Sequence, residues 1–524
     1  MSSYIKKTSS DFFVPTEHTG KVLAAGLRFL PDALFCFPMD REGNIVDVKV
    51  EGCILSEMRE MLAAIAPWVR EGSYHKWVYR WPTAQAEEKL ARQVASMLSF
   101  KQKGQEDGLA QKLSQIEGKL GLSLNGEQRQ AVLTALGSPI TILTGGPGTG
   151  KTMTQKALLA LYREIHPEGK IVCCAPTGRA ARRMEESTGV EASTIHRALK
   201  LMAGEDGAYA PPEPLDADLV LVDEVSMMDI YLAGHLFHSL PPGCQLVLVG
   251  DADQLPSVGP GAVLSELIAC GRIPVVRLSK IYRQSSGSRI AANAMLIRNG
   301  NLHLEYGSDF QFYECADLRH SADMVETLYL QEAARLGVDN VALLSPFRKR
   351  TETGVDALNL RLQEKVNPPD PAKSELTLGK RTFRLGDKVM QVKNFEDVSN
   401  GDIGKVTEVD TAREEPFLTV DFGDGRVKEY ARPDLDRLDL AYAATIHKSQ
   451  GSEYHTVIVN LQCAHAVMLT RPLLYTAITR AKMRVILVGE RKALCMAIRR
   501  TDTERRGTQL AARIQEELQK REGN

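Results

Sequence analysis

Eight short apolar runs recur along the chain, and polar sequence follows each of them. They lie at Pro139–Leu143, Ile171–Ala175, Leu219–Val222, Gln245–Val249, Val275–Leu278, Val341–Leu344, Val457–Asn460 and Arg484–Val488. Runs of this length with few polar positions are typical of strands buried on both faces of a parallel sheet. Most are separated by enough chain for a crossover helix, so the pattern predicts an α/β fold.

Three regions depart from this alternation. Residues 1 to about 120 carry one amphipathic pattern, at Ala84–Ser99, and predict a mainly helical N-terminal region. The Gly- and Pro-rich stretch Met202–Pro214 predicts a loop or small hairpin. From Arg381 to about Arg432 apolar and polar positions alternate with the period of strands, and Gly423–Gly425 forms a turn signal. We therefore expect a small antiparallel barrel inserted into the second half of the α/β architecture.

Composition limits the class of protein more than its partners. A chain of 524 residues is too long for one hydrophobic core, which predicts two to four domains. The nine cysteines show no zinc-ligand spacing, and neither a signal peptide nor a bilayer-length apolar run is apparent. We expect a reduced, cytoplasmic protein with no membrane contact. The net charge of −1 gives no sign of a polyanionic partner, although a local basic channel would suffice to bind one.

The polar segment after the first run carries the clearest chemical signal. It is a G-x-x-x-x-G-K-T motif made of Gly145, Gly146, Pro147, Gly148, Thr149, Gly150, Lys151 and Thr152. Its glycines allow successive backbone N–H groups to face phosphate oxygens. Lys151 would reach the β- and γ-phosphates of ATP, and Thr152 would bind Mg²⁺. Taken alone, such a motif can also be a degenerate loop, so the other segments that follow strands decide its meaning.

Three polar side chains after the next strands fit phosphoryl transfer. Asp223 and Glu224 follow Leu219–Val222, and Asp223 suits the metal's water shell while Glu224 suits a base that positions the attacking water. Gln254 follows Gln245–Val249, and its neutral amide could bond the γ-phosphate or that water. The alternatives are an acidic pair that caps a helix and a glutamine in a turn.

Two arginines in the second half are candidates for stabilising the transition state from across a cleft. Arg283 lies in Lys280–Gln284 and Arg480 lies in the sequence YTAITRA. A guanidinium that arrives from a second lobe would couple closure of the lobes to hydrolysis. The alternative for either residue is an ordinary solvated arginine.

The ordered set of motifs resembles that of superfamily 1B DNA helicases of the RecD-like group, close to its stand-alone bacterial form. The match covers roughly residues 120–500 and rests on LNGEQ, GGPGTGKT, APTGRAARRM, STIHRAL, DEVSMMD, GDADQLPSVGPG, IYRQ, TIHKSQGSE and YTAITRAK. The resemblance implies two RecA-like domains with ATP and Mg²⁺ between them. It also implies 5′→3′ movement on single-stranded DNA and action at junctions of single and double strands, by a motor that works as a monomer.

Further site residues are implied by this resemblance alone. Gln128 would read the adenine edge, Tyr282 would stack near the base, and Glu453 would touch the ribose. The residues implied for contact with the DNA backbone are Pro176, Thr177, Arg179, Thr194 and His196 from the first domain and Thr445, His447 and Ser449 from the second. Each also has a structural alternative, such as a helix-capping or core histidine.

The resemblance also divides the chain. The expected units are an N-terminal region at 1–120, domain 1A at 121–273 with a short 1B hairpin near 201–216, domain 2A at 274–380 and 434–500, an SH3-like 2B insertion at 381–433, and a charged C-terminal helix or tail at 501–524. No helix–hairpin–helix pair is apparent in residues 1–120, which predicts an N-terminally shortened member.

Other functions fit the same residues. One alternative is a translocase that displaces proteins with weak unwinding. Another is the motor subunit of a recombination-nuclease complex, in which residues 1–120 dock repair or recombination proteins. An ATP-binding switch with no role in nucleic-acid chemistry is a third alternative, and it predicts hydrolysis that is indifferent to single-stranded DNA.

Overall fold

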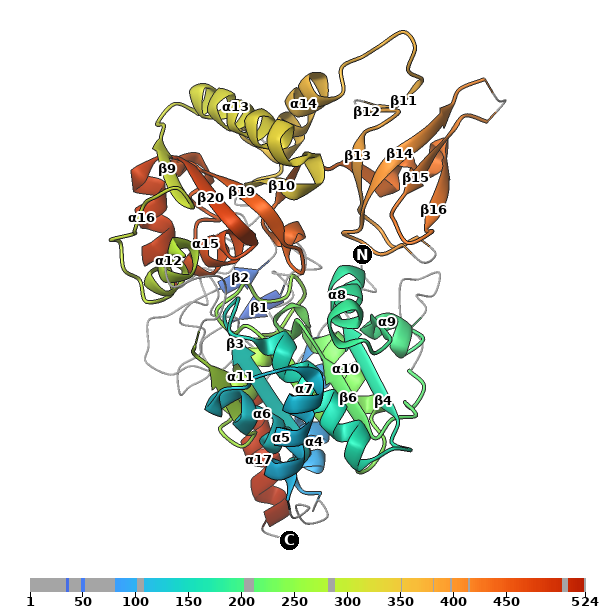
Figure 1. The fold of residues 1–524 in the computed structure, drawn as a ribbon, viewed down its shortest axis with the longest axis vertical. Helices are drawn as coiled ribbons and strands as arrows, with labels where there is room; N and C mark the ends of the chain where they lie inside the picture. Colours follow the sequence, from blue (N-terminus) through green and yellow to red (C-terminus); the bar gives the residue numbers. More distant parts are fainter. Residues whose placement is uncertain are drawn as a thin grey trace, which may run out of the picture.

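The computed structural model describes residues 34–36, 49–51, 81–100, 108–201, 212–280, 288–349, 351–379, 381–395, 398–412, 415–501 and 508–522. Two α/β domains stack along the long axis, and a small β domain projects from the side of the second (Figure 1). Most of the expected hairpin at Met202–Pro214, together with Tyr282 and Arg283, lies outside the described residues.

The first domain is built on a six-stranded parallel sheet. Its strand order is β5 (Ala192–Thr194), β4 (Ile171–Ala175), β6 (Leu219–Val222), β7 (Gln245–Gly250), β3 (Ile140–Gly145) and β8 (Val275–Leu278). The five predicted runs of this half are therefore strands, and their parallel pairing is confirmed. β4, β6, β7 and β3 read as continuous apolar sequence because helices cover both faces of the sheet.

Helices surround this sheet in two layers. They are α4 (Trp81–Leu98), α5 (Leu109–Leu120), α6 (Gly126–Leu136), α7 (Lys151–Ile165), α8 (Gly178–Thr188), α9 (Ile195–Ala198), α10 (Ile230–Ser239) and α11 (Val263–Ala269). The α6 start is fixed by a capping box between Asn125 and Gln128, in which each side chain accepts from the other residue's backbone N–H. Thr177 and Asp229 likewise cap α8 and α10.

The expected boundary at residue 274 is wrong by one strand. That boundary places β8 in domain 2A, but β8 pairs in parallel with β3 and forms the edge of the first sheet. The reason is that α11 returns the chain to this sheet, where the edge of β3 would otherwise expose unpaired backbone groups. The first domain therefore extends to about residue 280.

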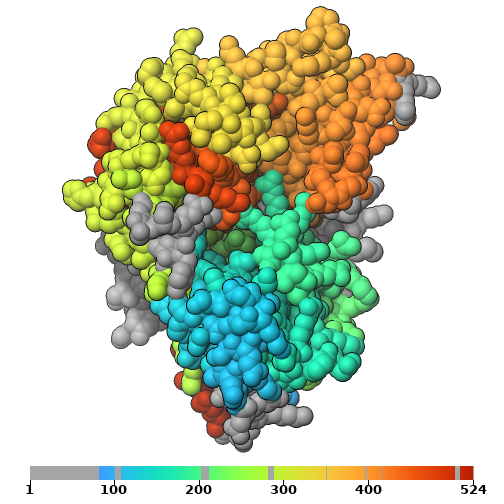
Figure 2. Space-filling model, viewed as in Figure 1, coloured from blue at the N-terminus to red at the C-terminus, as the bar shows by residue number. Residues whose placement is uncertain are grey.

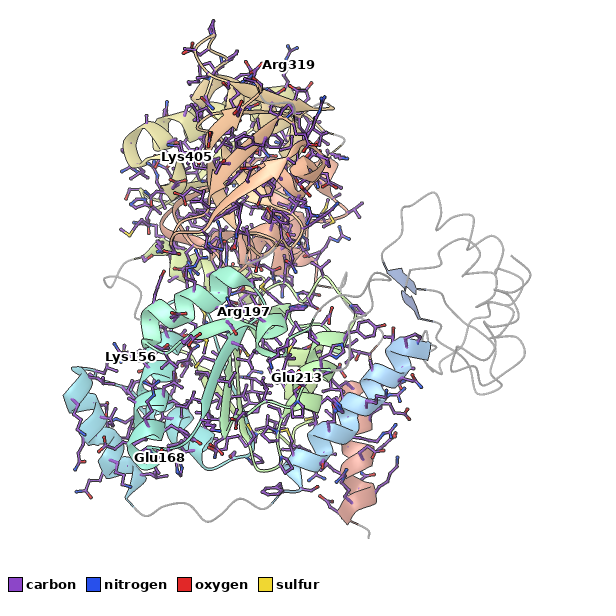
Figure 3. The ribbon with its side chains drawn as sticks, turned by 90° about the vertical axis from the view of Figure 1, so that its right-hand side faces the viewer. Lys156, Glu168, Arg197, Glu213, Arg319 and Lys405 are labelled. Atoms are coloured by element: carbon purple, nitrogen blue, oxygen red, sulfur yellow. The ribbon has the colours of Figure 1, made fainter. Side chains whose placement is uncertain are left out.

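The helix predicted at Ala84–Ser99 exists as α4, and its partner is the distant C-terminal helix α17 (Leu510–Glu522) (Figure 3). Leu510, Ile514 and Leu518 of α17 join the core of the first domain. Glu87 of α4 is buried and accepts from Thr508 Oγ1 at 2.9 Å, and Arg513 Nε lies 3.0 Å from Glu87 Oε1. The segment expected as a charged helix or tail is thus a docked helix, held by an apolar stripe and a buried ion pair.

The second domain is built on a five-stranded sheet. Its strand order is β18 (Ala443–Thr445), β10 (Val341–Ser345), β19 (Tyr454–Leu461), β20 (Ala481–Gly489) and β9 (Phe310–Glu314), and every pair is parallel. The three predicted runs of this half are its central strands. β9 and β18 escaped sequence analysis because they lie at the edges, where short strands with polar side chains are tolerated.

The helices of the second domain lie on both faces of its sheet. They are α12 (Arg289–Arg298), α13 (Leu318–Leu336), α14 (Val355–Val366), α15 (Arg471–Ile478) and α16 (Arg491–Arg499). Among the described residues, the helices are too short or too polar to cross a bilayer. Two short antiparallel strands, β1 (Leu34–Cys36) and β2 (Lys49–Glu51), are described in the N-terminal region.

The predicted antiparallel insertion is present. Its sheet has the order β16 (Val427–Ala431), β15 (Phe417–Asp421), β14 (Ile403–Asp410), β13 (Lys388–Gln391) and β17 (Leu438–Leu440), and a hairpin of β11 (Glu375–Leu378) and β12 (Arg381–Arg384) precedes it. Buried Asp387 fixes this insertion to the second domain, because Asn367 Nδ2 and Tyr442 Oη both donate to Asp387 Oδ1 at 2.8 Å. Burial raises the pKa of Asp387, whereas these hydrogen bonds act to lower it. The joint is thus a buried polar network whose members are hydrogen-bonded to one another.

Buried His465 predicts a pH dependence of stability. Its side chain is fully enclosed beside Thr353 and the Phe347 ring, and burial lowers its pKa to about 4 from 6.5. Protonation of His465 therefore favours the unfolded state. Its contribution to the free energy of unfolding is fully present above pH 6.5 and is lost as the pH falls toward 4. At pH 5 the loss is about 2 kcal/mol. Urea unfolding of the wild type should weaken between pH 7.5 and 5.0 by about this much more than that of His465→Gln, and equal pH dependence would contradict the assignment.

Candidate nucleotide site and nucleic-acid groove

The glycine-rich loop connects β3 to α7 as a cradle of backbone groups. Gly148 and Gly150 have left-handed φ angles of 75° and 86°, which a side chain would strain. Lys151 Nζ donates to the carbonyl oxygens of Gly145 at 2.6 Å and Gly146 at 3.1 Å. The ammonium group therefore lies within the loop at the N-terminus of α7, where backbone N–H groups and the helix dipole favour an anion. This arrangement fits a nucleoside triphosphate.

Two glycines of the loop permit close approach by other segments. A Cβ on Gly145 would lie 2.9 Å from the Leu278 carbonyl oxygen, so β8 leaves no room for a side chain there. A Cβ on Gly146 would lie 2.9 Å from the Tyr475 hydroxyl of the second domain. The second domain thus reaches the phosphate loop directly.

The acidic pair lies where β6 ends, beside this loop. The Asp223 carboxylate accepts from the Glu224 backbone N–H at 2.8 Å, and Glu224 has a left-handed φ of 52°. Non-glycine residues held in this region cost energy and occur often at functional sites. Burial, and then the charge of Asp223, raise the pKa of Glu224, whereas Arg480 and Lys151 act in the opposite direction. A buried carboxylate whose pKa is raised is suited to proton transfer.

Gln254 lies in the loop after β7 and is almost fully buried. Its amide nitrogen donates to Asp251 Oδ2 at 3.2 Å. Within the described structure, its amide oxygen and the Ser226 hydroxyl have no hydrogen-bond partner, and both residues line one small cavity. Buried polar atoms of this kind are normally satisfied by a water molecule or a ligand. Contact of Gln254 with the γ-phosphate stays a prediction.

The next residue, Leu255, anchors this loop in the second domain. Its side chain belongs to the apolar core there and is 2% exposed. Its backbone N–H donates to Thr476 Oγ1 at 2.9 Å, and its carbonyl oxygen accepts from Gln450 Nε2 at 3.0 Å. Sequence analysis missed Leu255, because an apolar residue inside a polar motif has no pattern that reveals its partner. The loop that carries Gln254 is therefore fixed to both domains.

The C-terminal part of helix α15 and the residues that follow it face the nucleotide loop from the second domain. The Tyr475 hydroxyl donates to Asp251 Oδ2 at 3.0 Å, and burial raises the pKa of Tyr475. Arg480 is buried, and its guanidinium donates to the carbonyl oxygens of Thr476 and Ser452. The charge of Arg480 acts to lower the pKa of Glu224, so this guanidinium of the second domain lies near the acidic pair, and its contact with a nucleotide stays a prediction.

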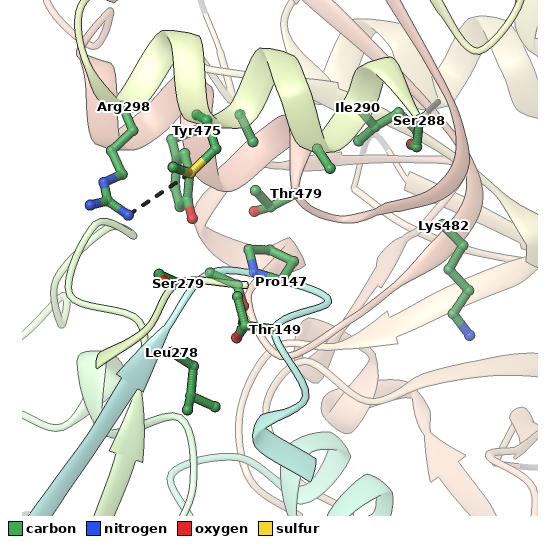
Figure 4. A pocket seen from close by; sticks show the side chains of 14 residues that line it. Pro147, Thr149, Leu278, Ser279, Ser288, Ile290, Arg298, Tyr475, Thr479 and Lys482 are labelled. Carbon is green, nitrogen blue, oxygen red and sulfur yellow. Dashed lines mark hydrogen bonds between the residues drawn. The ribbon is translucent and has the colours of Figure 1, made fainter. Parts of the chain in front are cut away.

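A pocket lies between the two domains beside the phosphate loop (Figure 4). Pro147 and Thr149 form one wall, Ile290 and Arg298 of α12 and Tyr475 form the other, and Leu278 lies beneath. The apolar lining, open between the lobes, suits the flat face of a nucleotide base.

Two residues expected at the base and ribose are engaged elsewhere. Gln128 is buried, and its amide accepts from the Asn125 backbone N–H and donates to the Thr149 carbonyl oxygen. Glu453 forms ion pairs with Arg183 at 3.2 Å and Lys482 at 3.8 Å. Their contacts with a nucleotide stay predictions.

A larger groove runs between the domains on the side of the insertion. Its volume is about 1220 Å³, and six of the eight residues expected to contact DNA line it together: Pro176, Thr177, Arg179, His196, Thr445 and His447. Burial lowers the pKa of His196, so this side chain is neutral at pH 7. The groove also includes loops Asn400–Asp402 of the insertion and Ser257–Gly259 after the Leu255 anchor.

The two remaining candidates have structural roles. The Thr194 hydroxyl accepts from the Arg197 backbone N–H and caps α9. Ser449 is fully buried and donates to the Ile446 carbonyl oxygen at 2.7 Å, so its side chain does not reach the groove. The Ser449 hydroxyl therefore shapes the turn, and contact of this residue with the DNA backbone stays a prediction.

Helix α8 joins all three units through its arginines. Arg179 donates to Ser452 and to Tyr454 Oη in the second domain, Arg182 pairs with Asp424 of the insertion at 3.1 Å, and Arg183 pairs with Glu453. The insertion also packs on the start of this helix, where a Cβ on Gly178 would lie 3.1 Å from the Ser399 hydroxyl. Figure 2 shows the orange insertion resting on the green edge of the first domain. Sequence analysis placed only Arg179 here, although the GRAARR cluster was the signal for all three.

Three family profiles match consecutive parts of the chain. They describe an AAA domain at residues 128–260, an ATP-dependent RecD-like DNA helicase SH3 domain at 358–422, and a UvrD-like helicase C-terminal domain at 440–488. The SH3 match identifies the inserted β domain, and the other two cover parts of the first and second α/β domains.

Relatives match over most of the chain. An ATP-dependent RecD2 DNA helicase of Deinococcus radiodurans is 36% identical over 90% of this chain, which spans 62% of that protein. A RecBCD enzyme subunit RecD of Mycobacterium tuberculosis is 32% identical over 71% of both chains. A crystal structure of Pif1 helicase from Candida albicans aligns with a TM-score of 0.44 and 21% identity, over 70% of this chain and 94% of that one. On the identity and coverage of its sequence relatives, the chain belongs to the RecD-like helicase family.

Proposed function

We propose that this chain is an ATP-driven DNA helicase that translocates 5′→3′ on single-stranded DNA and unwinds the duplex ahead. The observation that carries the proposal is the loop from Asp251 to Gly259. Gln254 and Asp251 lie at its nucleotide side, Leu255 is anchored in the second domain, and Ser257–Gly259 line the groove. One continuous segment thus connects the candidate nucleotide site with the candidate DNA groove. The name of the Deinococcus relative, an ATP-dependent DNA helicase, supports an ATP-driven helicase activity.

ATP would lie between the domains with its phosphates in the Gly145–Thr152 loop. Lys151 is positioned to stabilise the phosphate charge, and Thr152 and Asp223 are the residues that would hold Mg²⁺. Bound Mg²⁺ would neutralise charge that develops on the β- and γ-phosphate oxygens. Thr152 is exposed at the start of α7.

Hydrolysis would use groups from both domains. Glu224 would accept the proton of the attacking water, since burial raises its pKa above that of an exposed carboxylate and makes it a stronger base. Arg480 would stabilise the transition state from the second domain, and Arg283 is proposed for the same role. Because Arg480 is bonded to Thr476 and Ser452, a change in the position of the second domain would move its charge relative to the phosphates.

Motion along the strand would follow from alternating closure of the lobes. The groove residues come from both domains, so a change in domain separation changes the spacing of the two sets of strand contacts. We expect a monomeric, cytoplasmic motor that acts on single strands and junctions. The mycobacterial relative is a subunit of the RecBCD enzyme, which keeps open the alternative that this chain works as a motor within a complex.

Unwinding of tailed duplexes tests the proposed polarity. The purified chain with ATP and Mg²⁺ should separate a duplex with a 5′ single-stranded tail at least about tenfold faster than the matched duplex with a 3′ tail, because a motor of fixed direction reaches the junction from one side only. Strand separation followed by fluorescence measures both rates. Preference for the 3′ tail would contradict the direction, and inactivity on both would favour the alternative of a motor that requires partners.

Replacement of Lys151 by alanine tests the assignment of the nucleotide site. Loss of this cation should reduce ATP turnover by about 100-fold or more, because a charge that stabilises the transition state is removed from a preorganised site. The fold and much of the binding to single-stranded DNA should remain. Lys156→Ala on the same helix is the matched control and should hydrolyse ATP at the wild-type rate. A Lys151→Ala protein with normal turnover would contradict the assignment of this loop as the ATP-binding site.

A further inference from the structure

A small cavity lies between the turn after β6, the loop after β7 and helix α11. Its volume is about 40 Å³. Ser226, Asp251 and Gln254 contribute polar groups to its wall, and Val263 and Leu264 of α11 contribute apolar ones. The cavity therefore separates the segment that carries the acidic pair from the loop that carries Gln254.

Two buried polar atoms of the residues around this cavity lack a hydrogen-bond partner within the described part of the chain. They are the Gln254 amide oxygen and the Ser226 hydroxyl, and each residue is only 7% exposed. A buried polar group without a partner destabilises the folded state, so such groups are normally satisfied. Because the two residues belong to different segments and line the same space, one shared partner could satisfy both atoms.

The two atoms have complementary needs that a water molecule meets. The Gln254 amide oxygen only accepts, whereas the Ser226 hydroxyl both donates and accepts. A bridging water would donate to the amide oxygen and accept from the hydroxyl, and the Asp251 carboxylate lines the same cavity as an acceptor for its second proton. The volume of about 40 Å³ exceeds the roughly 15 Å³ that one bound water requires. The cavity is therefore both large enough and polar enough for an ordered water.

The position of Ser226 relates this cavity to the chemistry of hydrolysis. Ser226 lies in the 3₁₀ turn Val225–Met227, two residues after Glu224. This turn packs on the end of β7, where a Cβ on Gly250 would lie 3.4 Å from the Ser226 backbone nitrogen. A bridge from Ser226 to Gln254 would therefore fix the Gln254 amide relative to the acidic pair.

The other end of the Gln254 amide is already held at the contact between the domains. Gln254 Nε2 and Tyr475 Oη both donate to Asp251 Oδ2, at 3.2 Å and 3.0 Å. Tyr475 belongs to the second domain, so this end of the amide is tied to the position of that domain. A bond to the amide oxygen as well would leave the side chain a single orientation.

We propose that an ordered water in this cavity joins the Ser226 hydroxyl to the Gln254 amide oxygen, and that Ser226 is thereby a positioning residue for Gln254. Ser226 does not touch the nucleotide. Through the water it holds the amide in the orientation from which Gln254 acts on the γ-phosphate or the attacking water. The inference rests on the proposed function, because Gln254 needs a fixed orientation only if it takes part in hydrolysis.

A crystal structure that resolves ordered solvent tests the bridge directly. It should show a water about 2.8 Å from both Ser226 Oγ and Gln254 Oε1. In Ser226→Ala this water should be lost or the Gln254 amide should turn away, since one of the partners is removed. A wild-type structure in which no water contacts these two atoms would overturn the bridge.

ATP turnover in the presence of single-stranded DNA tests the positioning role. Ser226→Ala should lower kcat about fivefold, the effect of one hydrogen bond, and leave KM for ATP little changed. In a Gln254→Ala background the same substitution should cause no further loss, since the group that Ser226 orients is gone. An equal loss in both backgrounds, or no loss in either, would overturn the positioning role.

Ser265→Ala is the matched control. Ser265 lines the same cavity, but it is exposed and its hydroxyl already donates to the Ala262 carbonyl oxygen at 2.9 Å. Its kcat should therefore equal that of the wild type. Normal turnover in Gln254→Ala would overturn the positioning role and leave the helicase proposal intact. A wild-type protein that does not hydrolyse ATP with DNA would instead overturn the proposed function, while the crystal structure still decides whether the bridge exists.

Discussion

Burial of Leu255 from the first domain in the core of the second is the contact on which the functional architecture depends. Burying a leucine side chain contributes about 2 kcal/mol, and here both backbone groups of the residue are also bonded to the second domain. The adjacent Gln254 and Asp251 are held toward the nucleotide, and Ser257–Gly259 toward the groove. A displacement of the second domain is therefore expected to change the positions of groups at both the nucleotide site and the groove.

Two ion pairs of helix α8 are contacts of a different kind. The pairs Arg182–Asp424 and Arg183–Glu453 are partly exposed, with side-chain exposures of 33% and 65% for the first and 35% and 29% for the second. Such pairs are worth at most about 1 kcal/mol each. These two pairs can break and re-form while the leucine anchor persists, so they are suited to a changing contact and the loop after β7 to a fixed one.

Much of the fold could be predicted from the sequence because buried parallel strands consist of uninterrupted apolar runs. The phosphate loop, the acidic pair and the inserted β domain could also be predicted, because each depends on a local sequence pattern. Features that depend on distant contacts were not accessible. The docking of α17 on α4 requires knowledge of where Glu87 meets Arg513, and β8 reads as an ordinary strand whose sheet the sequence does not specify. The resemblance implies a DNA contact for Ser449, whereas the burial of its side chain depends on the turn at Ile446, which no pattern in the sequence indicates.

The most direct measurement of the central claim is the stimulation of ATP turnover by single-stranded DNA in Leu255→Ala, with Leu255→Met as the volume-conserving control. Truncation removes the anchor while every group proposed to contact ATP or DNA remains. The account predicts that the ratio of turnover with DNA to turnover without it falls toward one in the alanine protein and is restored in the methionine protein. A folded Leu255→Ala protein that single-stranded DNA stimulates as strongly as the wild type would contradict the account.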